Sequence, residues 1–184
     1  MALGLTSVNT LAYWTDQAQM SGGTIQSGSL DLLILDGQLT GQGGSVANPA
    51  MATTAMIPGE SFAFTVPVQR KANTAGFALT ATATAAGTLA PHVQWAVFEG
   101  SAGAQSTNAN GLRTATCSGT QLSNGVTLGG TAQPVIASAN AVNFGGSVFS
   151  KNICVRVTLP STASNAAQSL TATATFAFTA TQLQ

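Results

Sequence analysis

Hydrophobic and polar residues alternate with a period of two along much of the chain, and helical periodicity is scarce. Such alternation places one face of a β-strand in a core and the other in solvent. The pattern predicts strands over residues 61–68, 77–84, 93–97, 153–159 and 170–181. Residues 30–35 are apolar on both faces, which predicts a central strand that is covered on both sides.

Residues that favour turns separate these runs. Turns or hairpins are expected at Pro58-Gly59, Ala75-Gly76, Asn110-Gly111 and Asn124-Gly125. Residues 100–111 and 119–147 are rich in Gly, Ser, Asn and Ala and are expected to form long surface loops with short strands among them. Many short strands joined by such turns predict an all-β, antiparallel sandwich or barrel.

The chain has 184 residues, which is the size of one domain. A domain of this length buries about 70% of its unfolded surface and can therefore build its own core. Its 45% hydrophobic content argues against disorder, because disordered chains combine low hydrophobicity with high net charge.

Charged residues make up only 5% of the chain, and five acidic and five basic residues cancel; ordinary soluble domains have roughly 25%. So few cations exclude nucleic acid as a partner, because they cannot neutralise a row of phosphates. Near-zero net charge favours association between copies of a protein. The last predicted strand carries no charge at all, and a neutral strand at a sheet edge invites pairing with another strand.

The two cysteines, Cys117 and Cys154, form no CxxC pair, and a zinc site would need more ligands than these two and His92. We expect one disulfide, with two buried thiols as the alternative. A disulfide implies an oxidising compartment outside the cytoplasm. No stretch approaches the ~20 apolar residues of a membrane-spanning helix. The first twelve residues are mildly apolar without Lys or Arg, as in the tail of an export signal.

Two N-terminal motifs carry a resemblance to a known family: YWTD at residues 13–16 and SGGTIQSGSLDL at residues 21–32. They resemble the start of the TasA/camelysin family, in particular actinobacterial members with the alternate type of signal peptide. Weaker similarity lies at Pro58-Gly59-Glu60, at Ala75-Gly76 and in the closing run FAFTATQ at residues 176–182. The N-terminal motif covers about twenty residues and is specific, whereas the rest of the resemblance is architectural.

The resemblance implies a jelly-roll-like β-sandwich that leaves the cell through a SipW-type signal peptidase and builds biofilm-matrix fibres. In such fibres the N-terminal strand of one subunit inserts into a groove of the next. The family's cleavage site would fall near residues 12–13. We therefore expect residues 1–12 to be a signal-peptide remnant or donor segment, and residues 13–184 to form one β-sandwich domain.

The N-terminal segment supplies the candidate residues for contact between subunits. An inserted strand gains affinity from backbone hydrogen bonds and specificity from alternate side-chain pockets. The expected donor side chains are Leu3, Leu5, Val8, Leu11, Tyr13 and Trp14. The alternative is that Tyr13 and Trp14 anchor the first strand of their own subunit.

Residues for catalysis are scarce in this sequence. His92 is the single histidine, so the metallopeptidase activity described for camelysin-like relatives lacks both an HExxH motif and a second imidazole. Asp31 and Asp36 lack the further oxygen ligands that calcium requires. No nucleophile elbow, P-loop or dinucleotide-binding motif is present. We predict a protein that is not an enzyme and holds no metal or cofactor.

Two functions from different classes remain. The first is a secreted structural subunit that polymerises head to tail with itself, because a heterologous contact that does not close generates an open filament. The second is a monomeric cell-surface or matrix-bound protein, either a carbohydrate-binding module or a weak peptidase. A carbohydrate site usually gathers exposed aromatic side chains, and the few beyond phenylalanine (Tyr13, Trp14 and Trp95) make such a cluster hard to build.

Overall fold

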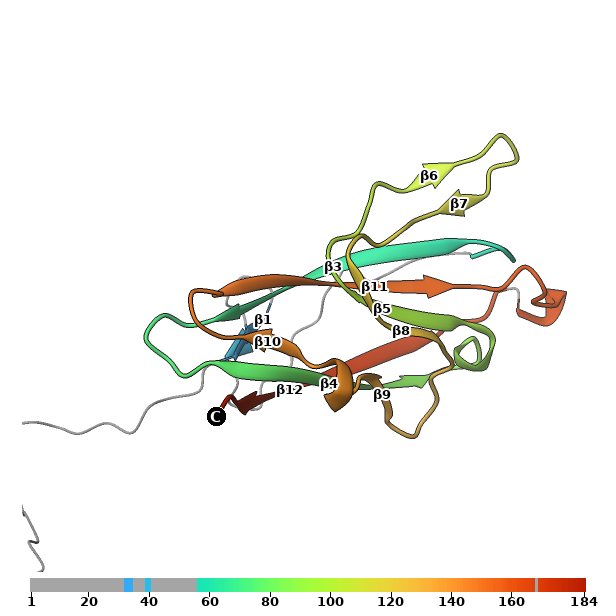
Figure 1. Cartoon of the computed structure of the whole chain (residues 1–184). Helices are drawn as coiled ribbons and strands as arrows, with labels where there is room; N and C mark the ends of the chain where they lie inside the picture. The colour runs from blue at the N-terminus through green and yellow to red at the C-terminus, as the bar shows by residue number, and fades with distance from the viewer. Residues whose placement is uncertain (1–31, 35–38, 41–55, 168) are drawn as a thin grey trace, which may run out of the picture.

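A computed structural model describes residues 32–34, 39–40, 56–167 and 169–184. The strands lie in two layers, with β3, β11 and β5 in one and β4 and β12 in the other (Figure 1). All strand pairings are antiparallel. The predicted all-β, antiparallel fold is therefore confirmed.

The larger layer, sheet A, has six strands in the order β2-β1-β3-β11-β5-β8. Their bounds are β1 Leu32–Ile34, β2 Leu39–Thr40, β3 Ser61–Arg70, β5 Gln94–Glu99, β8 Thr120–Val126 and β11 Ser150–Thr158. The smaller layer, sheet B, has the order β10-β4-β12, and β9 also pairs with β4. Its strands are β4 Phe77–Ala86, β9 Gln133–Ile136, β10 Val142–Phe144 and β12 Thr173–Gln182.

A separate two-stranded hairpin, β6 (Ser106–Thr107) and β7 (Arg113–Thr114), projects from the body of the sandwich (Figure 1). Its tip is the predicted Asn110-Gly111 turn, in which the Gly111 N–H donates to the Asn108 carbonyl (2.9 Å). Three short 3-10 turns complete the secondary structure: η2 Ala90–His92, η3 Ser138–Asn140 and η4 Asn165–Ala167.

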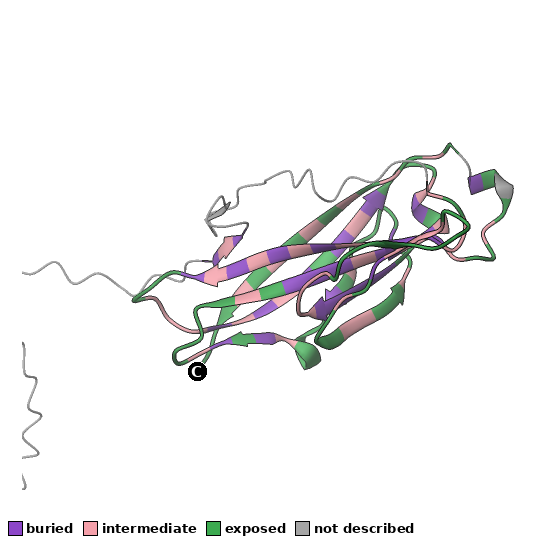
Figure 2. Ribbon diagram, turned by 90° about the horizontal axis from the view of Figure 1, so that it is seen from above, coloured by how far each residue is buried: buried purple, intermediate pink, exposed green. Residues whose placement is uncertain are grey.

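The core lies between the two sheets and is built from the alternating apolar positions. Buried and less buried residues follow one another along the long strands (Figure 2). In β4, for example, Phe77, Leu79, Ala81, Ala83 and Ala85 are buried, and the residues between them are not. Phe77 stacks on Phe144 of β10 with ring centroids 4.7 Å apart. The period-two pattern thus decided which face of each strand points inward.

Three sequence-based expectations need correction. The strand predicted at residues 30–35 is described only as β1, which lies second from the end of sheet A rather than at its centre. Asn124-Gly125 forms no hairpin but lies within β8, where the register with β5 shifts. The last strand begins at Thr173, not at residue 170. Gly125 adopts φ 65°, so its left-handed backbone forms an irregularity within the strand rather than a turn between strands.

Candidate assembly surface

Strand β12 is an edge strand of sheet B. All ten of its residues pair with β4, from Thr173 opposite Ala86 to Gln182 opposite Phe77. Among the described residues, β12 has no strand partner on its other side. A row of backbone groups is therefore left open along one side of the sandwich.

The hydrogen-bond pattern identifies which backbone groups lie along this open edge. The Leu183 N–H donates to the Gly76 carbonyl (2.9 Å), just beyond the last pair of the β4–β12 ladder. In an antiparallel ladder, hydrogen-bonded and non-hydrogen-bonded pairs alternate. The odd-numbered residues of β12 therefore bond to β4, and the even-numbered residues direct their N–H and C=O groups away from it. The open edge is formed by Ala174, Phe176, Phe178, Ala180 and Gln182.

The side chains of these residues, except Gln182, pack against the core but stay partly exposed. Phe176 makes an edge-to-face contact with Trp95 of β5, with centroids 5.7 Å apart. On the paired strand β4, the equivalent inward residues are fully buried. The edge of β12 thus combines open backbone groups with incompletely covered aromatic rings.

The other described edges of the two sheets are short or irregular. Strands β2 and β10 have two and three residues. Strand β9 contains Pro134 and shifts register against β4. Strand β8 shifts register twice against β5. Shortness, proline and bulges are features by which natural sheets prevent edge-to-edge pairing. Strand β12 shows none of them over ten residues.

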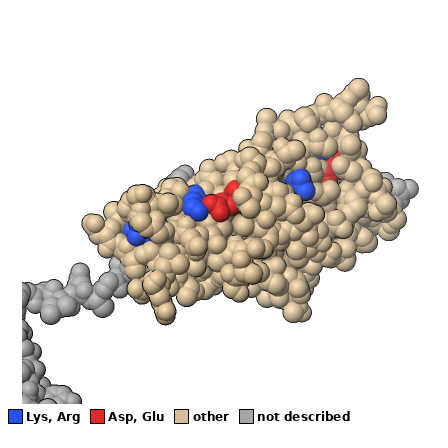
Figure 3. Space-filling view, viewed as in Figure 1, with Lys and Arg blue, Asp and Glu red and all other residues tan. Residues whose placement is uncertain are grey.

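The outer face of sheet B, which points away from the core, consists mainly of threonine. Its residues are Ala78, Thr80, Thr82, Thr84 and Ala86 of β4, and Thr173, Thr175, Ala177, Thr179 and Thr181 of β12. None of the four strands of sheet B contains Asp, Glu, Lys or Arg. In the side view of Figure 3, the charged side chains form a few separate groups on a surface that is otherwise uncharged. We call the outer face of β4 and β12 in sheet B the threonine face.

Part of the outer face of sheet A, around Cys154, is covered instead by the two ends of the segment 100–119, here called the covering segment, whose middle part forms the projecting β6–β7 hairpin. The predicted disulfide is present between Cys117 of this segment and Cys154 of β11, with Cα atoms 5.8 Å apart. Cys154 is buried together with Ala96 and Phe98, on the side of sheet A away from the main core. A Cβ on Gly100 would collide with the Ser118 carbonyl, so glycine permits the two ends of the segment to cross closely.

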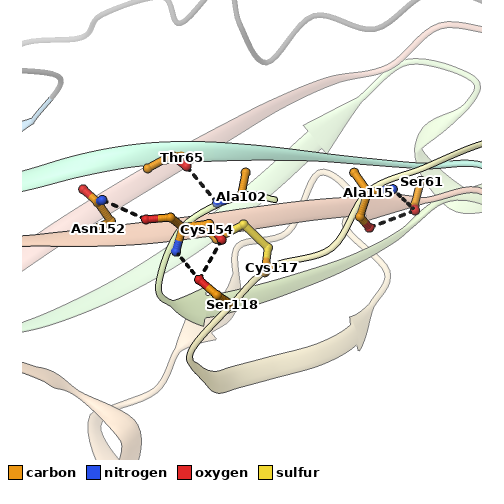
Figure 4. Close-up of a disulfide and its surroundings, with 9 residues drawn as sticks. Ser61, Thr65, Ala102, Ala115, Cys117, Ser118, Asn152 and Cys154 are labelled. Carbon is orange, nitrogen blue, oxygen red and sulfur yellow. Dashed lines mark hydrogen bonds between the residues drawn. A yellow bond between two sulfur atoms is a disulfide. The ribbon is translucent and has the colours of Figure 1, made fainter. Parts of the chain in front are cut away.

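Hydroxyl groups fix the covering segment to β3 (Figure 4). The Ala102 N–H donates to Thr65 Oγ1 (2.9 Å). The Ala115 N–H donates to Ser61 Oγ (3.0 Å), whose hydroxyl donates back to the Ala115 carbonyl (3.2 Å). Each bond satisfies a backbone group that the sheet itself does not pair.

The carboxylate of Glu60 binds Arg113 at the base of the β6–β7 hairpin. Glu60 is 1% exposed and accepts bonds from Arg113 Nε (2.6 Å) and Nη2 (2.7 Å). Its oxygens also accept from the backbone N–H groups of Ile57 (2.9 Å) and Arg113 (3.2 Å). Burial raises the pKa of Glu60, but these hydrogen bonds, led by that of the Arg113 side chain, outweigh burial and leave the pKa below its ordinary value. Glu60 therefore stays ionised and links the start of β3 to β7.

The predicted donor side chains lie outside the described residues, as do Asp31 and Asp36. His92 is the last residue of η2 and lies just before β5. No group of three or more His, Cys, Asp or Glu side chains within the described ranges is arranged to hold a metal ion. No helix in the described part of the chain is long and apolar enough to cross a membrane.

Sequence reasoning missed the Glu60–Arg113 pair and the role of the covering segment. The available signal was the scarcity of charge, because a charged residue in so neutral a chain is expected to have a specific partner when buried. Comparisons with protein-family models, curated proteins and solved structures find no match for this chain. Function is therefore inferred from the surfaces of the molecule.

Proposed function

We propose that this protein is a secreted structural subunit that polymerises with itself into extracellular fibres, as its resemblance to the TasA/camelysin family implies. The observation that carries the proposal is the ten-residue, charge-free edge of β12. In this proposal the N-terminal segment, roughly residues 2–20, of one subunit pairs with the β12 edge of the next. The jelly-roll arrangement expected from the family belongs to the same proposal.

The proposed contact would pair the open backbone groups of the β12 edge and would also cover its partly exposed aromatic rings. A strand added beside β12 would accept and donate hydrogen bonds at the five even-numbered residues. Its apolar side chains would also cover Phe176 and Phe178, which the subunit itself leaves partly exposed. Burying two aromatic side chains, such as those of Tyr13 and Trp14, contributes roughly 3–6 kcal/mol before the cost of ordering the segment.

The disulfide supports the location that the proposal requires. A disulfide between Cys117 and Cys154 is typical of proteins outside the reducing cytoplasm. A covalent bond inside each subunit also suits a fibre that must persist without repair. Secretion into a biofilm matrix remains part of the proposal.

The test compares filament formation by three variants in electron micrographs. Deletion of residues 1–20 and the substitution Ala180→Pro should each abolish filaments, the first by removing the donor and the second by removing one open N–H. Ala180→Ser is the matched control, since it keeps the N–H, and should form filaments. Circular dichroism and thermal unfolding establish that each variant is folded.

Each result has a definite meaning. Filaments of unchanged helical repeat from the deletion variant would show that the N-terminal segment is not the donor. Filaments from Ala180→Pro would show that the β12 edge is not the acceptor. A wild-type protein that stays monomeric at all concentrations would contradict polymerisation itself.

A further inference from the structure

We propose that Asn110, at the tip of the β6–β7 hairpin, is a site of spontaneous deamidation, and that the side chain of Asn108 sets the rate of this reaction. The sequence contains two Asn-Gly steps, Asn110-Gly111 and Asn124-Gly125, and the structure places them in different surroundings. The inference goes beyond the proposed function and does not depend on it. It assigns to the hairpin a covalent change that needs no reactant other than water.

The reaction uses the backbone nitrogen of the residue that follows the asparagine. The Gly111 nitrogen attacks Asn110 Cγ, and the new N–C bond closes a cyclic imide. The side-chain amide leaves as ammonia together with the proton of the Gly111 N–H. Water then opens the imide on either side and leaves aspartate or isoaspartate at position 110, without any oxidation or reduction. Glycine favours the attack because it has no side chain beside the attacking nitrogen.

The tip of the hairpin leaves room for this reaction. Residues 103–111 are all exposed, and the hairpin stands away from both sheets (Figure 1). Gly111 has φ 79°, and no described atom beyond its chain neighbours lies within 4 Å of the position that a Cβ would occupy. Because an exposed turn opens at little cost in free energy, Asn110 can reach the geometry of attack without unfolding of the sandwich.

Asn108 holds the same turn closed. Its Oδ1 accepts hydrogen bonds from the backbone N–H groups of Asn110 (2.9 Å) and Leu112 (2.9 Å). Its carbonyl accepts from the Gly111 N–H (2.9 Å), and its own N–H donates to the Leu112 carbonyl (3.0 Å). The attack on Asn110 requires that the Gly111 N–H leave the Asn108 carbonyl. The bonds to the Asn108 side chain therefore slow the reaction, because they stabilise the closed turn.

The second Asn-Gly step is held on both sides. Ser123 and Val126 are both paired with β5, and Asn124-Gly125 lies between them. Asn124 is exposed and the space around Gly125 is open as well, so exposure alone does not distinguish the two sites. Movement at Asn124 must disturb the pairing of β8 with β5, whereas movement at Asn110 disturbs only a turn. We therefore expect Asn110 to react first.

Deamidation changes the charge of a neutral chain. Five acidic and five basic residues cancel, so one additional carboxylate makes the formal net charge −1. The modified protein can therefore be separated from the unmodified protein by its charge. The isoaspartate product also lengthens the main chain between Asn108 and Gly111, so the hairpin tip must reorganise.

The test incubates the purified, folded protein at mildly alkaline pH and follows it by ion exchange and peptide mass spectrometry. The first acidic form should carry aspartate and isoaspartate at position 110. Asn108→Ala removes the side-chain acceptor and should raise the rate at Asn110 roughly fivefold, as expected for the loss of about one net hydrogen bond. Asn108→Asp is the matched control, since it keeps an acceptor oxygen, and should react at about the wild-type rate. The rate at Asn124 should be the same in all three proteins.

The outcomes separate the site from its control by Asn108. Reaction at Asn124 that is as fast as at Asn110, or an Asn110 that stays unmodified while the urea-unfolded chain reacts there, would overturn the assignment of the site. An unchanged rate in Asn108→Ala, or equal acceleration by Asn108→Asp, would overturn the role of the Asn108 side chain. Acceleration at both Asn-Gly steps in Asn108→Ala would show general loosening of the fold and would overturn that role as well.

Discussion

Part of the outer face of sheet A lies beneath the ends of the covering segment, whereas the outward residues of β4 and β12 in sheet B stay partly or fully exposed. A disulfide, an ion pair and several hydroxyl hydrogen bonds hold the covering segment in place. On the threonine face, the same kind of residue, threonine in the middle of a long strand, remains at the surface without such a role. The comparison indicates that the bonds formed on the outer face of sheet A contribute to the stability of the subunit.

The charge distribution follows the same division. The ion pair Lys151–Glu99 (2.7 Å) and the pair Glu60–Arg113 (2.6 Å) both involve sheet A or its attached hairpin. Surface charge normally keeps proteins apart. Within the described residues, charge is thus confined to sheet A, its attached hairpin and the positions next to β3.

Removal of the disulfide should have the largest effect on stability. The double variant Cys117→Ala and Cys154→Ala should lose roughly 4 kcal/mol of unfolding free energy, because the crosslink closes a long loop of the unfolded chain. Urea denaturation of the variant and of the oxidised wild type measures the difference. Hydrogen exchange should show lost protection in the covering segment but not in β4 and β12. A loss of protection spread equally over both sheets would contradict the division between the two faces.

Loss of the buried carboxylate should have the next largest effect. Glu60→Gln removes the negative charge of the group that accepts bonds from Arg113 and from two backbone N–H groups, and should cost about 1.5–3 kcal/mol, the range for hydrogen bonds to charged groups. The wild type should also lose this contribution in acid. Because folding lowers the pKa of Glu60, the stabilisation is complete above the unfolded value near 4.5 and disappears as the pH falls through the lower folded value.

Urea denaturation at several pH values tests both statements about Glu60. The difference in stability between wild type and Glu60→Gln should be constant near neutral pH and should shrink below pH 4.5. Glu99→Gln is a suitable control, because Glu99 is 35% exposed and its pair with Lys151 is expected to contribute little. A difference between wild type and Glu60→Gln that does not change with pH would mean that the charge of Glu60 is unimportant.

Local patterns in the sequence predicted much of the fold, but contacts between distant residues were predicted only where the chemistry left few choices. Alternation in β4 and β12 identified their inward faces, because a period of two has only two possible phases. The two cysteines had no competing partner, so their disulfide could be expected. By contrast, Glu60 and Arg113 are 53 positions apart, and no local pattern links them. The pairing of β12 with β4 depends on sheet order, which alternation does not encode.

The smallest expected effect compares two threonines directly. Thr65 of β3 and Thr82 of β4 both lie on outer faces, but Thr65 Oγ1 accepts a bond from the Ala102 N–H (2.9 Å). Thr65→Val preserves shape and removes that acceptor, so a partly buried N–H loses its partner and stability should fall by about 1–2 kcal/mol. Thr82→Val makes the same change at an exposed site and should alter subunit stability by less than about 0.5 kcal/mol.

Thermal and urea unfolding of the two threonine variants, measured at a concentration where the protein is monomeric, give the comparison. Since valine and threonine both favour the extended backbone, the difference between the two sites reports on the lost hydrogen bond and not on strand propensity. Equal effects at Thr65 and Thr82 would mean that the covering segment is held by the disulfide and the ion pair alone. If Thr82→Val were the more harmful change, the threonine face would have a structural role inside the subunit.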